Sequence, residues 1–244
     1  MHQQILIERK QYLLQLHNLK DQNIIKVITG VRRCGKSTLL MMFANDIIKK
    51  GVDANQIQFY NFEDLDILSI GDIYQIHTHI KERLIDDKMN YIFLDEVQNI
   101  KEFQRLVDSL YIKPNVDVYI TGSNAYMLSG ELATLLTGRY VEINILPLQF
   151  SEYYHFTLSK SPNLSRNEIL ANYIHFGGIP EYIKQLNNSE KQADLFAQSI
   201  LKTIVEKDIF QRLNITNKHD FNKILDFILD SVGSYVSPRS ISDT

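Results

Sequence analysis

The 244-residue chain has almost no cysteine, no long apolar run and no secretion signal. A single cysteine excludes a framework of internal disulfides and fits a reducing compartment. No apolar stretch approaches the roughly 20 residues that a membrane-spanning helix needs. The N-terminus lacks the basic start and apolar core of a signal peptide. These absences predict a cytoplasmic protein with no membrane partner.

The chain also lacks a strong excess of either charge, since its formal net charge is −3. Charged residues make up 23% and hydrophobic residues 44%, which is typical of a soluble globular protein. The overall charge therefore argues neither for nor against a nucleic-acid partner, and a local basic face stays open. The length suits one large domain and a smaller one.

The most informative motif lies between an apolar run and a helical pattern. It fits G-x-x-x-x-G-K-[ST], in which backbone N–H groups and a helix N-terminus cradle phosphates. We expect Lys36 to reach the β- and γ-phosphates and the Ser37 hydroxyl to bind Mg²⁺. A chance Gly-Lys-Ser turn is the alternative, but the strand before and the helix after favour a phosphate loop. The predicted binding residues are Gly30, Val31, Arg32, Arg33, Cys34, Gly35, Lys36, Ser37 and Thr38.

Cys34 is expected to fill a variable position of this loop. Its place near a helix N-terminus predicts a lowered thiol pKa. Arg32 and Arg33 are positioned to touch phosphate or DNA, or to be solvated loop charges.

Two carboxylates follow a second apolar run, and the first of them, Asp95, lies 59 residues after Lys36 (95 − 36). Ligands collect at the carboxyl ends of parallel strands, so both acids would face the phosphate loop. Asp95 would then hold Mg²⁺ through water, and Glu96 would polarise the attacking water. The alternative interpretation is that the two acids merely end a strand. The phosphate loop earlier in the chain makes this interpretation the less favoured one.

Two further candidates follow from strand ends. Either Ser123 or Asn124, after a third buried strand, could contact the γ-phosphate or the attacking water, or both could belong to a turn that caps the next helix. Arg139, before a fifth strand, could be a finger that stabilises transition-state charge, or could pair with a surface carboxylate. The sequence does not choose among these alternatives.

As a set, these motifs resemble those of P-loop ATPases of the AAA+ type, in the branch close to archaeal-type ATPases, STAND proteins and origin-recognition proteins. Bacterial and archaeal members of this kind often carry a further C-terminal domain, commonly nuclease-like. The resemblance spans residues 30–182. Besides the loop it includes 94–98, 121–123, 138–139, 147–153 and 176–182.

The resemblance implies a sheet of strand order 5-1-4-3-2, ATP as substrate and Mg²⁺ as cofactor. It implies the roles given above for the loop and the two acids, a sensing role for Ser123 or Asn124, and a finger role for Arg139. Whether this arginine acts within its own subunit or across a homo-oligomeric interface stays open. The turn at 177–180 resembles a lid turn near the nucleotide, which adds Gly178 and Pro180 to the binding residues. The chain departs from the typical pattern because no clear second-sensor arginine is found on a lid helix.

Strand patterns at 24–29, 57–61, 91–95, 116–121 and 140–146 alternate with helical patterns, which predicts an α/β fold with a parallel sheet covered on both faces. We predict an ATPase core over 1–146, a helical lid over 147–213 and the incomplete start of a winged helix-turn-helix over 214–244. Capping motifs at Ser165 and Ser189 predict lid helices. An apolar stripe from 221 to 232 and a helix start at Ser237-Pro238 predict two more helices. Because the sequence stops soon after the second start, we expect it to be a fragment of a longer protein.

The function expected from these features is ATP hydrolysis that drives a conformational cycle, with C-terminal parts acting on DNA or a protein partner. A slow nucleotide-dependent switch or binding module is the alternative, and Glu96 favours an enzyme. A small-molecule phosphotransferase is a third option, weakened by the absence of a recognisable acceptor site.

Overall fold

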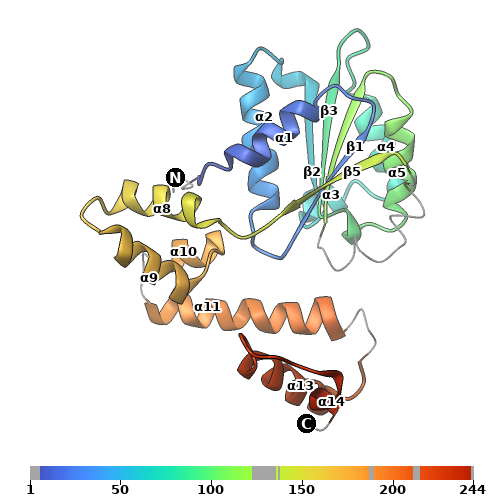
Figure 1. The fold of residues 1–244 in the computed structure, drawn as a ribbon. Coiled ribbons are helices and arrows are strands. Elements are labelled where there is room, and N and C mark those ends of the chain that lie inside the picture. The colour runs from blue at the N-terminus through green and yellow to red at the C-terminus, as the bar shows by residue number, and fades with distance from the viewer. Residues whose placement is uncertain (1–5, 123–135, 137, 187–189, 211–214, 243–244) are drawn as a thin grey trace. The chain divides into compact units, whose positions relative to one another are not determined.

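The computed structural model describes residues 6–122, 136, 138–186, 190–210 and 215–242. The chain forms two compact units, Met1–Ala197 and Gln198–Thr244. The first unit contains a twisted sheet flanked by helices, followed by a group of further helices (Figure 1).

In the described residues the sheet has five strands, all parallel, in the order β2-β3-β4-β1-β5. This order and the predicted α/β fold are confirmed, and each predicted strand end lies within one residue of the observed one. The register pairs Ile28 of β1 with Thr121 of β4, so the carboxyl ends of neighbouring strands meet at one edge of the sheet, here called the carboxyl edge. The strands are β1 (Ile25–Gly30), β2 (Ile57–Asn61), β3 (Asn90–Asp95), β4 (Val116–Thr121) and β5 (Tyr140–Ile145).

The three central strands are buried at every residue because helices cover both faces of the sheet. Helices α1 (Lys10–Leu19) and α2 (Lys36–Lys49) pack on one face, whereas α4 (Ile73–Lys81) and α5 (Phe103–Tyr111) pack on the other (Figure 1). The helices follow from apolar side chains spaced by three and four residues, each worth about 1.5–3 kcal/mol when fully buried. The remaining short elements are α3 (Leu65–Leu68) and 3₁₀ turns at Ala54–Gln56 and Val97–Asn99.

A buried ion pair lies at the opposite, amino edge of the sheet. Lys26 of β1 is paired with Asp117 of β4, and both side chains are fully enclosed. The Tyr119 hydroxyl and the Asp21 backbone N–H also donate to the Asp117 carboxylate, both at 2.9 Å. Burial raises the pKa of Asp117 and lowers the pKa of Lys26, because both charges are removed from water.

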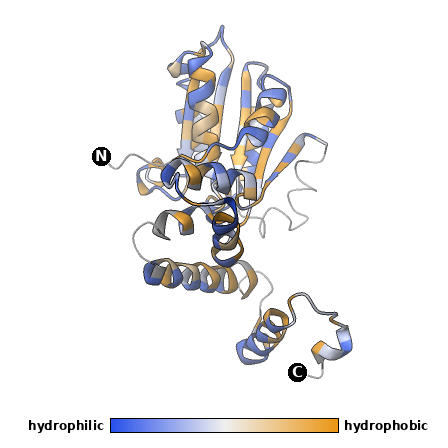
Figure 2. Cartoon of the chain, turned by 60° about the vertical axis from the view of Figure 1, so that its left-hand side comes forward, coloured by the Kyte–Doolittle hydropathy of each residue, from blue (hydrophilic) through white to orange (hydrophobic). Residues whose placement is uncertain are grey.

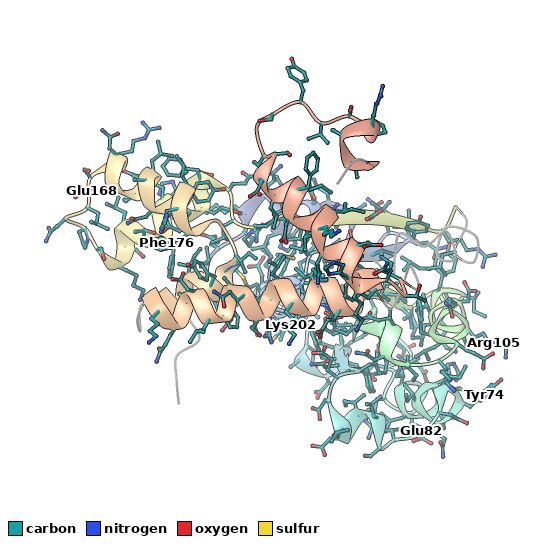
Figure 3. The ribbon with its side chains drawn as sticks, turned by 90° about the horizontal axis from the view of Figure 1, so that it is seen from below. Tyr74, Glu82, Arg105, Glu168, Phe176 and Lys202 are labelled. Carbon is teal, nitrogen blue, oxygen red and sulfur yellow. The ribbon has the colours of Figure 1, made fainter. Side chains whose placement is uncertain are left out.

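After β5 come α8 (Phe150–Lys160), α9 (Arg166–Phe176) and α10 (Pro180–Leu186). The predicted capping box of α9 is confirmed, since Ser165 Oγ accepts from the Glu168 N–H at 3.3 Å and the Glu168 carboxylate accepts from the Ser165 N–H at 2.8 Å. Figure 3 labels Glu168 and Phe176 at the two ends of this helix. A separate small core contains Ile7, Leu148, Tyr153, Ile169 and Ile183, so the N-terminal segment packs against these helices.

Helix α11 (Glu190–Thr203) crosses the boundary between the units and continues as a π-helical segment, Ile204–Phe210. The second unit then holds α13 (Lys218–Asp230), which is amphipathic, and the short α14 (Pro238–Ser242). Hydrophilic and hydrophobic residues are mixed along both helices (Figure 2). The start of α14 is as predicted, because Ser237 Oγ accepts from the Ser240 N–H at 3.1 Å. The predicted cap Ser189 lies outside the described residues. Among the helices that the structure describes, none is both long enough and apolar enough to span a bilayer.

Candidate functional site

The phosphate-loop candidate joins the end of β1 to the start of α2. Gly30 has φ of 151°, and a Cβ there would lie 2.4 Å from the Ile145 carbonyl oxygen and 2.7 Å from Cys34 Sγ. Gly35 has φ of 100° and directly precedes α2. Both glycines are therefore required by the backbone path, which brings the free N–H groups at the start of α2 into the loop.

Lys36 lies with its ammonium at the mouth of this loop. Its Nζ is 3.2 Å from the Gly30 carbonyl oxygen, 3.5 Å from that of Val31 and 3.7 Å from Glu96 Oε1. The side chain is 4% exposed, so this positive charge is held by the fold rather than by solvent. A cation held beside the start of a helix is suited to an incoming phosphate.

Ser37 and Asp95 come together at the carboxyl edge. Asp95 is the last residue of β3, and its carboxylate accepts hydrogen bonds from the hydroxyls of Ser37 and Thr121. Burial raises the pKa of Asp95, and the two hydroxyl bonds and Lys36 partly oppose that rise. A hydroxyl and a carboxylate are oxygen donors, the kind of ligand that Mg²⁺ prefers. These residues therefore fit Mg²⁺, which Ser37 and Asp95 would hold.

Glu96 adopts a left-handed conformation, with φ of 54° and ψ of 51°. Such a conformation is strained for a residue other than glycine and persists only where surrounding contacts hold it. Its N–H donates to Thr121 Oγ1 at 2.9 Å, and its Oε2 accepts from Gln98 Nε2 at 2.5 Å. The Thr121 hydroxyl thus contacts both predicted acids. It donates to the Asp95 carboxylate and accepts from the Glu96 backbone N–H.

Thr121 and Gln98 were not predicted as site residues. Both lie inside quoted motifs, at 121–123 and 94–98, so the motifs contained them without revealing their contacts.

A pocket opens beside the loop. Its walls come from the N-terminal segment, the loop, the first turns of α2 and the segments around α8 and α10. The lining residues are Ile7, Arg9, Cys34, Gly35, Thr38, Leu39, Met42, Leu148 and Pro180. Most of these side chains are apolar, and Arg9 and Thr38 add polar groups.

Arg9 is a third residue that sequence reasoning missed. Its guanidinium donates to Glu152 Oε1 at 2.9 Å, to the Cys34 carbonyl oxygen at 3.2 Å and to the Leu146 carbonyl oxygen at 2.7 Å. It lies 21 residues before the loop (30 − 9) in no recognisable motif, so no local pattern pointed to it. Its contacts tie the N-terminal segment to the loop, the end of β5 and α8.

The other loop residues differ in their surroundings. Val31 and Arg33 are exposed, and Thr38 lines the pocket. The expected lowering of the Cys34 pKa is wrong, because the thiol is buried and burial raises its pKa despite the nearby Lys36 and Arg9 charges. The Cys34 thiol also packs under Gly30, so it is enclosed by the loop.

The predicted lid turn reaches the same pocket. The carbonyl oxygen of Gly178 accepts from the Leu148 N–H at 2.7 Å. This bond ties the turn to the segment that follows β5, and Pro180 lines the pocket together with Leu148.

Arg139 lies away from the residues described above. Its carbonyl oxygen accepts from the Ile25 N–H at 2.8 Å, which places it at the amino edge, whereas the loop leaves β1 at the carboxyl edge. Its Nη1 lies 3.5 Å from Asp108 Oδ1, so within the chain it pairs with a surface carboxylate. Ser123 and Asn124 lie outside the described residues.

Comparisons with known proteins agree with this arrangement. Residues 22–154, more than half of the chain, match the family model described as AAA domain, and residues 167–244 match a domain of unknown function, DUF8612. An uncharacterized protein of Haemophilus influenzae is 37% identical over 98% of the chain and 59% of its own length. Uncharacterized protein MJ1544 of Methanocaldococcus jannaschii is 28% identical over 91% of the chain and 50% of its own length. The chain thus spans about half to three fifths of these relatives.

Solved structures share the fold at low sequence identity. The Walker-type ATPase PABY2304 of Pyrococcus abyssi has a TM-score of 0.57 and 16% identity, covering 88% of this chain and 78% of that one. AMPPCP-bound DnaA from Aquifex aeolicus has a TM-score of 0.50 and 13% identity, covering 96% and 73%. The sheet order, the loop after β1 and the family match lead to one conclusion: this chain belongs to the AAA domain family and has the fold of P-loop ATPases.

Proposed function

We propose that this protein binds ATP with Mg²⁺ and hydrolyses it to ADP and phosphate. The observation that carries the proposal is the meeting of Lys36, Ser37, Asp95 and Glu96 at the carboxyl edge. An ammonium, a hydroxyl–carboxylate pair and a second carboxylate are the groups that phosphoryl transfer to water requires.

In this proposal each side chain has one task. The loop N–H groups and Lys36 bind the β- and γ-phosphates, and Ser37 with Asp95 holds the metal. When bound, Mg²⁺ would neutralise charge on the phosphoryl oxygens. Glu96 accepts a proton from the attacking water, whose oxygen forms a bond to the γ-phosphorus while the bond to the ADP oxygen breaks.

The pocket supports a nucleotide rather than a simple polyphosphate. Apolar side chains such as Leu39, Met42 and Leu148 line it beside the loop residues Gly35 and Thr38. A purine there would contact both the loop and the segments around α8 and α10. A nucleotide that contacts both parts would stabilise one arrangement of them, and its hydrolysis would remove that stabilisation. This difference is how hydrolysis would drive a conformational cycle.

The partner of this cycle is part of the proposal. DNA or a protein is the partner we expect, acting through the C-terminal region. The chain spans 59% and 50% of the length of the two relatives, so the activity and partners of a whole protein are part of the proposal.

A slow nucleotide-dependent switch is the second candidate. It is favoured by the 3.7 Å contact between Lys36 and Glu96 Oε1, because the ammonium competes with water for that oxygen. In a switch, binding carries the signal and turnover is rare.

Binding and phosphate release, measured on matched variants, test the proposal. Lys36→Ala should weaken ATP–Mg²⁺ binding by calorimetry about 10-fold or more, whereas Lys49→Ala, at the exposed end of the same helix, should not. Glu96→Gln should bind ATP and lose about 100-fold or more in turnover, whereas exposed Glu63→Gln should keep the wild-type rate.

The outcomes separate the candidates. Tight ATP binding without phosphate release, with or without DNA, would favour the switch. Unchanged ATP affinity in folded Lys36→Ala would overturn the binding site itself.

A further inference from the structure

Gln98 has one end of its amide bound and the other end buried without a partner. Its Nε2 donates to Glu96 Oε2 at 2.5 Å. Its Oε1 is shielded from solvent and has no hydrogen-bond partner among the described residues. The orientation of the amide is fixed by chemistry, because a carboxylate can only accept, so the NH₂ group must face Glu96.

Such an orphaned oxygen is unfavourable for the fold. Buried polar atoms are nearly always hydrogen-bonded, and the exceptions call for an explanation such as a catalytic role. An aliphatic side chain of similar size would avoid the unpaired oxygen. Gln98 is therefore a poor choice for packing alone.

The backbone holds this amide at a set position relative to Glu96. Gln98 lies in the 3₁₀ turn Val97–Asn99, whose first residue is fully buried. The Asn99 N–H donates to the Glu96 carbonyl oxygen at 3.1 Å, and Thr121 fixes the Glu96 N–H. The turn and the proposed base therefore form one rigid unit.

We propose that Gln98 is a positioning residue for the hydrolytic step. Its N–H₂ group holds Glu96 Oε2, and its Oε1 accepts a hydrogen bond from the attacking water. This inference rests on the proposed ATP hydrolysis and assigns a task to a residue outside the loop and the acidic pair.

The contacts of Glu96 divide between two partners in a way that suits this role. Oε1 lies near Lys36, whereas Oε2 is bound by Gln98. When the Lys36 ammonium binds phosphate, Oε1 becomes available to the water and Oε2 stays with Gln98. The water then gives one proton to Glu96 and directs its other O–H to Gln98 Oε1, and Gln98 itself gains and loses no atoms.

The test is Gln98→Leu, which keeps side-chain bulk and removes both polar atoms. We expect the ATP affinity to stay within about threefold of wild type and kcat to fall about 10-fold or more. We also expect the thermal midpoint not to fall, because the unpaired oxygen is gone. A merely structural glutamine would lose stability instead.

The matched control is Gln58→Leu on β2. Gln58 is buried, whereas Gln98 is half-buried, and both ends of the Gln58 amide are bound. Its Nε2 donates to the Ile80 carbonyl oxygen at 3.2 Å, and its Oε1 accepts from the Tyr60 hydroxyl at 2.8 Å. This variant should lower the thermal midpoint and leave kcat unchanged.

A double variant shows whether Gln98 acts through the base. In a Glu96→Gln background, Gln98→Leu should reduce the residual rate far less than it reduces the wild-type rate. Equal reductions in both backgrounds would overturn the proposal, as would parallel losses of affinity and stability.

The two proposals fail in different ways. A wild-type protein without phosphate release would overturn hydrolysis and this role together. Wild-type release with an unchanged kcat in Gln98→Leu would overturn only the role of Gln98.

Discussion

The Arg9 guanidinium forms a 2.9 Å ion pair with Glu152 of α8, and both side chains are largely buried. The same guanidinium donates to the carbonyl oxygens of Cys34 in the phosphate loop and Leu146 after β5. One side chain therefore links the loop, the sheet and the first helix after it. The arginine therefore connects the loop backbone directly to α8.

Arg9→Met should be strongly destabilising. Methionine keeps the apolar stem but leaves the Glu152 carboxylate and two carbonyl oxygens without their donor. Removing one partner of a buried ion pair costs about 3–5 kcal/mol in the free energy of unfolding, measurable by urea denaturation.

Arg105→Met is the matched control. Figure 3 labels Arg105 and Tyr74, whose hydroxyl lies 3.4 Å from Arg105 Nη1, and the Arg105 pair with Glu102 is exposed. Its loss should change the unfolding free energy by less than about 0.5 kcal/mol. Similar losses for both arginines would contradict the linking role of Arg9.

Asp95→Asn should separate stability from metal binding. Burial raises the pKa of Asp95 above its ordinary value, so the folded state binds more protons than the unfolded state just above that value. Stability therefore falls as pH rises through the raised pKa, and at neutral pH the ionised carboxylate is unfavourable for folding. The asparagine variant has no buried charge at this position, so its thermal midpoint without Mg²⁺ should equal or exceed that of wild type at pH 7.

The advantage of Asp95→Asn should shrink as pH falls toward the ordinary carboxyl range. Mg²⁺-dependent ATP binding should be impaired at every pH, because the ionised oxygen ligand is lost. Exposed Asp87→Asn should change neither quantity. A thermal midpoint of Asp95→Asn lower than that of wild type at pH 7, with a difference that increases at higher pH, would contradict the expected direction of the stability change.

The Lys26–Asp117 pair should matter for stability and not for nucleotide binding. Lys26→Met leaves the buried Asp117 charge without its counter-ion and should cost about 3–5 kcal/mol of unfolding free energy. Adding Asp117→Asn should recover part of that loss, because a neutral amide oxygen still accepts from the Asp21 N–H or the Tyr119 hydroxyl.

ATP affinity should be unchanged in the folded Lys26 variants. Lys26 lies near the amino end of β1, whereas the loop leaves from its carboxyl end. A double variant less stable than Lys26→Met alone, or a weakened ATP affinity, would show that the pair has another role.

The sequence was sufficient for the sheet, and for placing the loop and the acidic pair at strand ends, because these signals are local. Three central strands are buried on both faces and therefore appear as continuous apolar runs, and the loop and acidic pair follow them directly. The linking role of Arg9 was out of reach because it depends on a contact with Glu152, 143 residues away. Cys34 was misjudged for a related reason, since the loop backbone turns its thiol inward under Gly30, where burial outweighs the helix N-terminus.

Arg139 is the predicted site residue whose position calls for an intermolecular test. It lies at the amino edge and pairs with Asp108, so it does not face Lys36 and Glu96 of its own chain. If it acts as a finger, it must reach a neighbouring subunit. Hydrolysis per molecule should then rise with protein concentration, and Arg139→Ala should bind ATP but turn over about 10-fold or more slowly.

Mixing two inactive variants gives the sharpest form of this test. Arg139→Ala supplies an intact Glu96 and Glu96→Gln supplies an intact Arg139, so one mixed interface would contain both groups and restore part of the activity. Arg105→Ala, which removes an exposed arginine of α5, should be active alone and serve as the control. Activity independent of concentration, with no recovery on mixing, would leave Arg139 as the surface partner of Asp108, because at the amino edge it lies away from Lys36 and Glu96 of its own chain.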